Sequence, residues 1–194
     1  LNTAPVQHGS AVAVIGLGGV GLAAVMGARV RGAAAIIGVD PVASRRETAL
    51  ELGATHVVDA GADDVIAAIK ALTGRRGADI VFEAVGRAAT IETAFAATRP
   101  GGTTCVVGAA STTEQISLPA HDLYIQGKTV VGCQYGSVVP GRDFPMLLDL
   151  WRAGRLPLDR LITRRIGLGQ VNEAFDDLKS GNGIRSVIVN EDPP

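Results

Sequence analysis

Residues 11–30 read AVAVIGLGGVGLAAVMGARV, an uninterrupted apolar run that passes through a cluster of glycines into an Ala-rich stretch. The run Ala11–Ile15 is typical of a buried strand, and Val20–Arg31 has the composition of a helix. Between them, Gly16, Gly18 and Gly21 fit the pattern G-x-G-x-x-G. A strand, a glycine turn and a helix in this order predict a crossover unit whose turn binds the phosphates of a ligand.

An acidic residue follows at the spacing expected for a dinucleotide site. Asp40 comes directly after the next apolar run, Ala35–Val39, and nineteen residues after Gly21. In such sites the acidic side chain accepts hydrogen bonds from the ribose of adenosine. A carboxylate at this position repels a 2′-phosphate, so we expect NAD to be preferred over NADP. Arg45 and Arg46 offer cations that reduce this preference.

The first 135 residues continue to alternate strands with helices. The further predicted strands are His56–Val58, Ile80–Glu83, Thr103–Val107 and Thr129–Cys133, and the further helices are Ala43–Leu52, Asp64–Leu72 and Ala89–Ala97. This alternation requires crossover connections and hence a parallel sheet. The strands are apolar throughout, which indicates that both faces are covered. We therefore predict an α/β fold over residues 1–135, a doubly wound six-stranded parallel sheet of the Rossmann type.

The pattern changes after Tyr135. Residues 136–194 contain a predicted helix at Phe144–Arg152, one or two short strands in LPLDRLITRRIGL (156–168), a helix at Val171–Leu178 and a last strand at Ser186–Val189. These residues are too few for a sizeable core of their own. We predict that they are a remnant of another domain, except for the first helix, which belongs with the sheet.

Composition excludes several other classes of protein. The net charge of -1 and the pI of about 6.3 argue against nucleic acid or an anionic membrane surface as a partner. Ala11–Ala28 carries no charge, but its glycines make it a poor membrane span. Two cysteines and three scattered histidines provide neither a disulfide framework nor a metal site, and they fit the reducing cytoplasm. We predict no metal ligand in this chain.

Particular residues also fit the patterns of other chemistries. Tyr124 and Lys128 fit the Y-x-x-x-K pair of short-chain dehydrogenases, but Gly127 and the strand predicted after it do not suit the long helix that this pair needs. Glu83 and His121 are acid–base candidates of types that are more often structural, so no catalytic residue is predicted. A methyltransferase and a non-catalytic NAD-sensing module remain open, because both use a similar turn.

Five further stretches carry a resemblance to a known family. They are ELGATHVVDA (51–60), GADIVFEAVGR (77–87), GGTTCVVGAA (101–110), VVGCQYGS (130–137) and GIRSVIV (183–189). Together with the glycine turn they resemble the cofactor domain of medium-chain, zinc-type alcohol dehydrogenases, over nearly the whole chain. Residues 143–168 are similar to the branch that oxidises thiol adducts of formaldehyde, such as S-(hydroxymethyl)mycothiol.

The resemblance implies a set of cofactor contacts, grouped by the part of NAD that each would meet. They are Gly18, Gly19, Val20 and Arg185 for the pyrophosphate, with Gly16 and Gly21 shaping the turn; Asp40 and Arg45 for the adenosine ribose; Val85 and Arg87 for the adenine; and Val107, Gly108, Ala109, Cys133 and Tyr135 for the nicotinamide. Ligands of such sheets bind beyond the carboxyl ends of the strands, where most of these residues fall. Without the resemblance, Val85, Val107 and Cys133 fit strand-end core equally well, and Arg185 fits a solvated charge.

The same resemblance implies what the rest of the enzyme supplies. In the family, hydride passes between the nicotinamide and an alcohol held on a zinc ion, whose ligands lie in a preceding catalytic domain. We therefore expect a small-molecule alcohol or aldehyde substrate, zinc only in the full-length enzyme, and no dehydrogenase activity from this chain alone. A homodimer through Thr129–Cys133 is expected, and the apolar residues Leu161, Ile162, Val187 and Val189 are expected to lack cover.

Overall fold

A computed structural model describes residues 2–190 of the chain. Contacts divide it into two units, residues 1–156 and residues 157–194. The first unit is built on a single sheet. Its strands are β1 (Ala11–Ile15), β2 (Ala35–Asp40), β3 (His56–Asp59), β4 (Ala78–Glu83), β5 (Thr98–Val106) and β6 (Thr129–Gly132).

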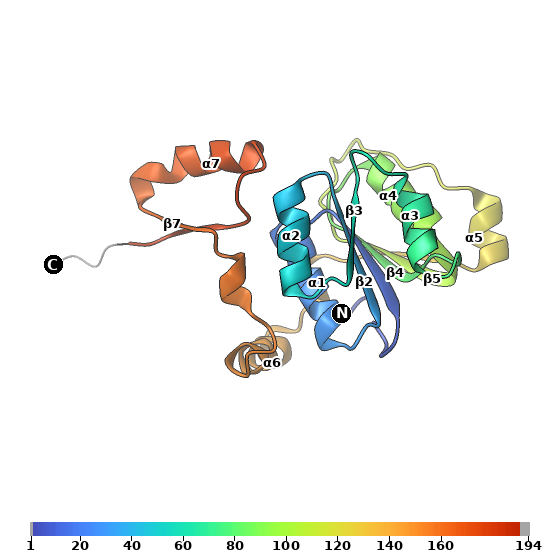
Figure 1. Ribbon diagram of the computed structural model, residues 1–194, viewed down its shortest axis with the longest axis horizontal. Coiled ribbons are helices and arrows are strands. Elements are labelled where there is room, and N and C mark those ends of the chain that lie inside the picture. Colours follow the sequence, from blue (N-terminus) through green and yellow to red (C-terminus); the bar gives the residue numbers. More distant parts are fainter. Residues whose placement is uncertain (1, 191–194) are drawn as a thin grey trace. The chain divides into compact units, whose positions relative to one another are not determined.

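All neighbouring strands in this sheet run parallel, in the order β3-β2-β1-β4-β5-β6 (Figure 1). The chain moves outward from β1 to β3 on one side and then from β4 to β6 on the other. β1 and β4 are therefore neighbours whose following connections leave in opposite directions. This is the doubly wound arrangement, and the predicted Rossmann fold is confirmed.

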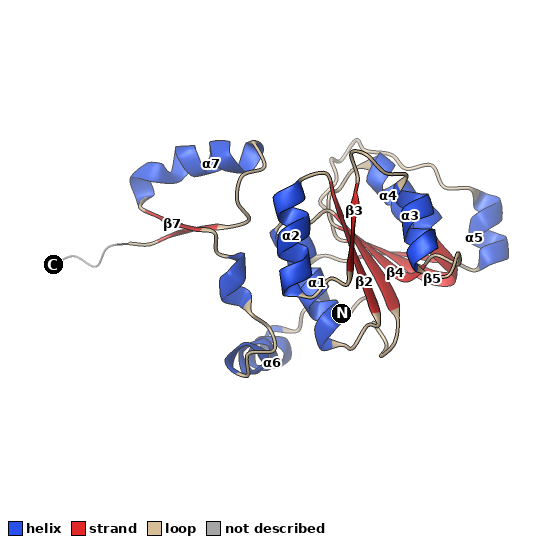
Figure 2. Cartoon of the chain, in the orientation of Figure 1, coloured by secondary structure: helices blue, strands red, loops and turns tan. Residues whose placement is uncertain are grey.

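Helices cover both faces of the sheet (Figure 2). The helices of this unit are α1 (Gly19–Val30), α2 (Ala43–Leu52), α3 (Val65–Leu72), α4 (Ala88–Ala97), α5 (Ala120–Gln126) and α6 (Pro140–Arg152). α1 and α2 pack on the β1–β3 half and on each other, while α3 and α4 contact each other and lie on the opposite side. Because both faces are covered, β1 and β2 are buried along nearly their whole length, which explains their continuous apolar sequences.

Two local features differ from the predicted elements. β5 begins at Thr98, before the predicted start at Thr103. Its pairing with β4 does not stop at Pro100 and the two glycines after it, but continues across them with a shift in register. The helix α5 was not predicted. None of its residues is buried, so it has no apolar face that the sequence pattern would reveal, and it ends at Gly127 in the left-handed conformation.

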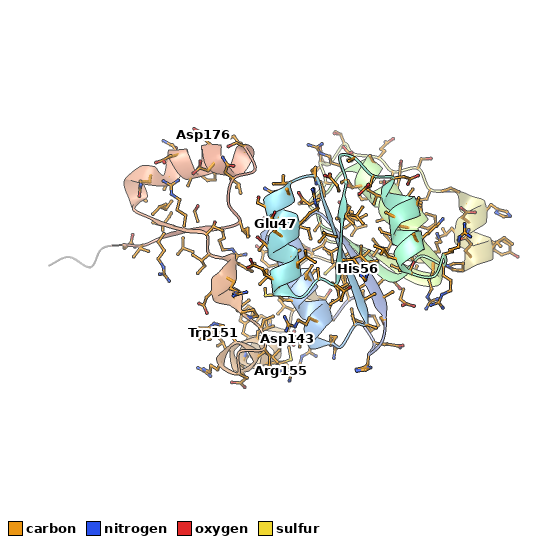
Figure 3. The ribbon with its side chains drawn as sticks, in the orientation of Figure 1. Glu47, His56, Asp143, Trp151, Arg155 and Asp176 are labelled. Atoms are coloured by element: carbon orange, nitrogen blue, oxygen red, sulfur yellow. The ribbon has the colours of Figure 1, made fainter. Side chains whose placement is uncertain are left out.

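The helix α6 falls with the first unit, and Asp143 is the residue that ties it there (Figure 3). The Asp143 carboxylate accepts hydrogen bonds from Asn2 Nδ2 at 2.9 Å and from Val139 N at 2.8 Å, and it pairs with Arg142 at 2.6 Å. The start of the chain is thereby joined to the start of α6. The first unit includes this helix and extends to Leu156, and the domain boundary after Tyr135 stays a prediction.

The second unit contains a two-stranded parallel sheet, β7 (Arg164–Ile166) and β8 (Ser186–Ile188), and the helix α7 (Val171–Lys179). Its predicted uncovered residues behave differently from one another. Leu161 is buried, so that expectation was wrong for it, whereas Val189 is 46% exposed. Among the residues described in the two units, no helix is long and apolar enough to cross a bilayer.

Candidate dinucleotide site

The glycine turn after β1 is shaped by packing inside the protein at two of its glycines. Gly16 has φ +90°, and a Cβ added there would lie 2.6 Å from Val85 Cγ2. A Cβ on Gly21 would lie 1.7 Å from the carbonyl oxygen of Gly16, so helix α1 reaches its position only with glycine there. Gly16 N also donates to Val39 O, which fixes the turn to the end of β2.

Gly18 differs from both, because a Cβ added there would meet no atom within 4 Å. It is the N-cap of α1 and offers no side chain to the helix. Within residues 2–190, the first-turn amides of Gly19, Val20 and Gly21 find no protein acceptor. The turn therefore presents open space and unused N–H donors at the positive end of a helix, an arrangement suited to a phosphate.

Asp40, at the end of β2, lies directly against this turn. Its Oδ2 accepts a hydrogen bond from Leu17 N at 2.8 Å, and its Oδ1 accepts one from Val42 N at 2.9 Å. Arg45 Nη1 lies 3.8 Å from Oδ2. The side chain is only 3% exposed, yet each carboxylate oxygen has a second acceptor position. The predicted acidic residue is thus brought to the turn, where it also fixes the backbone of the turn.

The second arginine after β2 is already engaged. Arg46 Nη1 donates to Asp40 O at 2.8 Å, and Arg46 Nη2 pairs with Asp59 at 2.8 Å. Its guanidinium therefore joins the ends of β2 and β3. Of the two cations expected to weaken a preference for NAD, this one is held by the sheet itself.

The loops after β4 and β5 meet backbone against backbone. Gly86 has φ +84°, and a Cβ on Gly108 would lie 2.1 Å from Gly86 N. The structure thus brings the predicted adenine-side residues Val85 and Arg87, both exposed, next to the predicted nicotinamide-side residues. Of that second group, Val107 and Gly108 are half-buried and Ala109 is exposed.

Sequence reasoning gave no role here to Glu83, the last residue of β4. Its Oε1 accepts hydrogen bonds from Val85 N, Gly86 N and Thr90 Oγ1, each at 2.8 Å. Glu83 is entirely buried. The sequence signal for such a role was a carboxylate at the end of an apolar strand. Its hydrogen-bond partners, however, are fixed only by the loop that follows.

Past β6, the chain leaves the sheet through an unusual turn. Tyr135, Gly136 and Ser137 all have positive φ, and the Tyr135 side chain is 88% exposed. Cys133 N still donates to Val106 O, so Cys133 keeps the line of the strand. Burial raises the pKa of the neighbouring Cys105 thiol to about 12, and proximity to Cys133 adds to the shift.

Arg185 belongs to the second unit, so its expected contact with the pyrophosphate stays a prediction. Thr163 Oγ1 accepts hydrogen bonds from Ile184 N and Arg185 N, which fixes the backbone at this point. Together with Phe175 and Leu178, among others, Arg185 lines a hollow of about 260 Å³ within that unit.

The short-chain dehydrogenase pair does not assemble. Lys128 is 8% exposed, and its Nζ donates to Phe95 O at 2.8 Å. Tyr124 is 83% exposed on α5, and Gly127 ends that helix between the two residues. The two side chains therefore do not share one helix face. In the described part of the chain, no three Asp, Glu, His or Cys side chains gather as a metal site.

Comparison with known proteins identifies relatives of this chain. Residues 19–153 match the family model described as zinc-binding dehydrogenase. Geraniol dehydrogenase from Castellaniella defragrans is 40% identical over 190 residues, which are 97% of this chain and 50% of that protein. The chain spans about half the length of the curated relatives that it matches.

Two solved structures show the same relationship in three dimensions. An alcohol dehydrogenase zinc-binding domain protein from Burkholderia ambifaria superimposes with a TM-score of 0.91 at 38% identity, covering 96% of this chain and 50% of that one. A protein from Sinorhizobium meliloti described as a zinc-binding dehydrogenase and bound to NADP gives 0.82 at 31% identity, covering 95% and 52%.

Proposed function

This chain belongs to the zinc-binding dehydrogenase family, and we propose that it is the dinucleotide-binding part of an NAD-dependent alcohol dehydrogenase. The observation that carries the proposal is the turn at Gly18, open and rich in free amides, with Asp40 hydrogen-bonded to it. The turn lies where the connections after the neighbouring strands β1 and β4 leave in opposite directions, which is where ligands of doubly wound sheets bind.

Each predicted contact has a distinct task in this proposal. The amides of Gly19 and Val20 hold the pyrophosphate, and Arg185 adds a cation to it. Asp40 and Arg45 hold the adenosine ribose. The remaining contacts are Val85 and Arg87 at the adenine, and Val107, Gly108, Ala109, Cys133 and Tyr135 at the nicotinamide. A bound NAD would supply hydride transfer at an alcohol carbon, and these residues of the chain would orient its nicotinamide ring.

We propose that NAD is preferred over NADP. The buried Asp40 carboxylate lies at the turn, where a 2′-phosphate would meet its negative charge. Arg46 is occupied by Asp40 O and Asp59, and Arg45 Nη1 lies 3.8 Å from Asp40 Oδ2. One structural neighbour is bound to NADP, and a comparison of the affinities for NADH and NADPH tests the preference in this chain.

The zinc and the substrate belong to the proposed whole enzyme and not to these residues. The described side chains do not fit a zinc site, because no group of three suitable ligands occurs among them. We therefore propose that zinc, the alcohol or aldehyde substrate and the catalytic groups are held by the other half of the full-length protein. On this proposal the chain alone binds NAD without turnover.

The proposed assembly and location rest on two features of the first unit. β6 is the last strand in the sheet order and pairs only with β5 among the described strands, so its outer edge is open to a second copy. We propose a homodimer through Thr129–Cys133. Both cysteines, Cys105 and Cys133, are free, which supports a cytoplasmic setting.

Calorimetric titration of the full chain with NADH, NADPH and S-adenosylmethionine tests the proposal. We expect NADH to bind, NADPH to bind about tenfold more weakly and S-adenosylmethionine not to bind. Binding of S-adenosylmethionine alone would favour a methyltransferase and end the proposal. Alcohol oxidation by the purified, metal-stripped chain would contradict the assignment of catalysis to the other half.

A further inference from the structure

Glu83 occupies the point of the sheet where the two halves of the site meet. It is the last residue of β4 and pairs with Ile15 of β1 on one side and with Val106 of β5 on the other. No part of it is exposed. A carboxylate at such a position has been removed from water, so its hydrogen bonds must offset the loss of solvation.

The side chain of Glu83 holds the loop after β4. A single oxygen, Oε1, receives Val85 N, Gly86 N and the Thr90 hydroxyl, each at 2.8 Å. The other oxygen, Oε2, is buried and has no hydrogen-bond partner in the described part of the chain. A buried carboxylate with one unpartnered oxygen is unfavourable for folding alone, and its presence therefore calls for a reason.

The backbone of Glu83 holds the loop after β5. Its carbonyl oxygen accepts hydrogen bonds from Val107 N at 2.8 Å and Gly108 N at 2.9 Å. Above it the two loops touch, with no room for a Cβ between Gly108 and Gly86. One residue thus fixes both loops through two separate groups.

We propose that Glu83 is a positioning residue for the dinucleotide, which sets the spacing between the adenine-side loop and the nicotinamide-side loop. The inference rests on the proposed function. Glu83 is not assigned any contact with the ligand, because its oxygens are covered. It acts through Val85 on one loop and through Val107 and Gly108 on the other.

Asp79 provides a matched control at the opposite end of the same strand. Its carboxylate accepts Ala11 N at 2.7 Å and pairs with Arg99 at 2.5 Å. It therefore anchors backbone as Glu83 does, although 27% of its side chain is exposed, and it lies at the amino edge of the sheet, away from the predicted contacts. Loss of Asp79 measures what a purely structural carboxylate contributes.

The experiment compares Glu83→Ala, Glu83→Gln and Thr90→Val with Asp79→Ala in the full chain. Each variant is titrated with NADH and with ADP-ribose, which lacks the nicotinamide, and its thermal unfolding is recorded. Amide hydrogen exchange of residues 84–87 and 107–109 is followed without ligand. Thr90→Val removes one of the three bonds to Oε1 and serves as a milder variant where Glu83→Ala does not fold.

We expect Glu83→Ala to weaken NADH by about tenfold or more, and ADP-ribose by less, because only NADH uses both loops. Exchange should accelerate in both loops. Glu83→Gln should stay within about threefold of wild type, since its amide oxygen accepts the same donors. Thr90→Val should lie between them, and Asp79→Ala should lose stability but keep its NADH affinity.

Three results would overturn the inference. The first is unchanged NADH affinity in folded Glu83→Ala or, where that variant does not fold, in Thr90→Val. The second is an equal loss of NADH affinity in Glu83→Gln and Glu83→Ala. The third is a loss of NADH affinity in Asp79→Ala as large as that in Glu83→Ala. If wild type bound neither NADH nor ADP-ribose, the proposed function would fail instead. Exchange in the ligand-free protein would still show whether Glu83 joins the two loops.

Discussion

Replacing Gly18 by alanine separates binding from folding. The backbone of Gly18 has φ −73° and ψ −171°, a conformation open to any residue, and the added methyl group meets no protein atom within 4 Å. The methyl group would instead point into the space assigned to the pyrophosphate. The substitution should therefore leave the fold intact and reduce affinity for the dinucleotide.

The expected magnitudes follow from the turn. Alanine is a poorer N-cap than glycine, but it also restricts the unfolded chain, so the net change in the free energy of unfolding should stay within about 0.5 kcal/mol. For a chain of this size, that shifts the melting temperature by about 2 °C at most. Losing one hydrogen bond from an amide to a charged phosphate is worth roughly 1.5–3 kcal/mol, or a ten- to hundredfold weaker Kd.

The assay is NADH titration by nicotinamide fluorescence, paired with thermal unfolding, and Gly21→Ala is the control. Its Cβ would lie 1.7 Å from Gly16 O, so the helix or the turn must move. We expect it to lower stability by on the order of 1–3 kcal/mol, or several degrees. A Gly18→Ala protein that melts normally and binds NADH within about twofold of wild type would refute the idea that these amides hold a diphosphate.

Three further predictions concern other residues. Asp40→Ala should weaken NADH by about ten- to hundredfold in calorimetry, because it removes both the acceptor for the ribose and the anchor of the turn; an unchanged Kd would contradict this. Iodoacetamide at pH 8 should modify Cys133 and spare Cys105, whose pKa is raised to about 12 by burial, and NADH should protect Cys133. The Arg142 guanidinium lowers the pKa of Asp143 to about 2. The stability that this carboxylate adds is therefore complete above its unfolded pKa of about 4 and is lost as the pH falls toward 2. The stability of Asp143→Asn, measured by acid unfolding, should not show this loss between about pH 4 and pH 2.

The sheet was predictable because its signals are local. The bounds of β1 and α2 agree with the predicted ranges to the residue, since the glycine that follows each element, Gly16 and Gly53, is visible in the sequence. The doubly wound parallel sheet was predicted from the alternation of strands with helices and from the glycine turn at the first crossover. α5 was missed because it is short and buries no side chain.

The location of the candidate site was predictable for a related reason, because parallel strands bring their carboxyl ends to one edge. The sequence did not show which hydrogen bonds the side chains of the site make. Asp40 and Leu17 are joined across twenty-three positions, and Glu83 makes its three bonds only after the following loop has turned back over it. Such contacts depend on the folded backbone and leave no pattern in a single chain.

The bond between Leu17 N and Asp40 Oδ2 has a consequence for redesign of cofactor choice. Asp40, which is assigned to distinguish the two riboses, also accepts a hydrogen bond from the turn assigned to the diphosphate. Recognition of the ribose and of the diphosphate therefore depends on the same side chain. A single substitution of Asp40, made to admit a 2′-phosphate, would weaken the binding of both NAD and NADP. Engineers who wish to swap the preference should supply a replacement acceptor for the Leu17 amide before they remove the carboxylate.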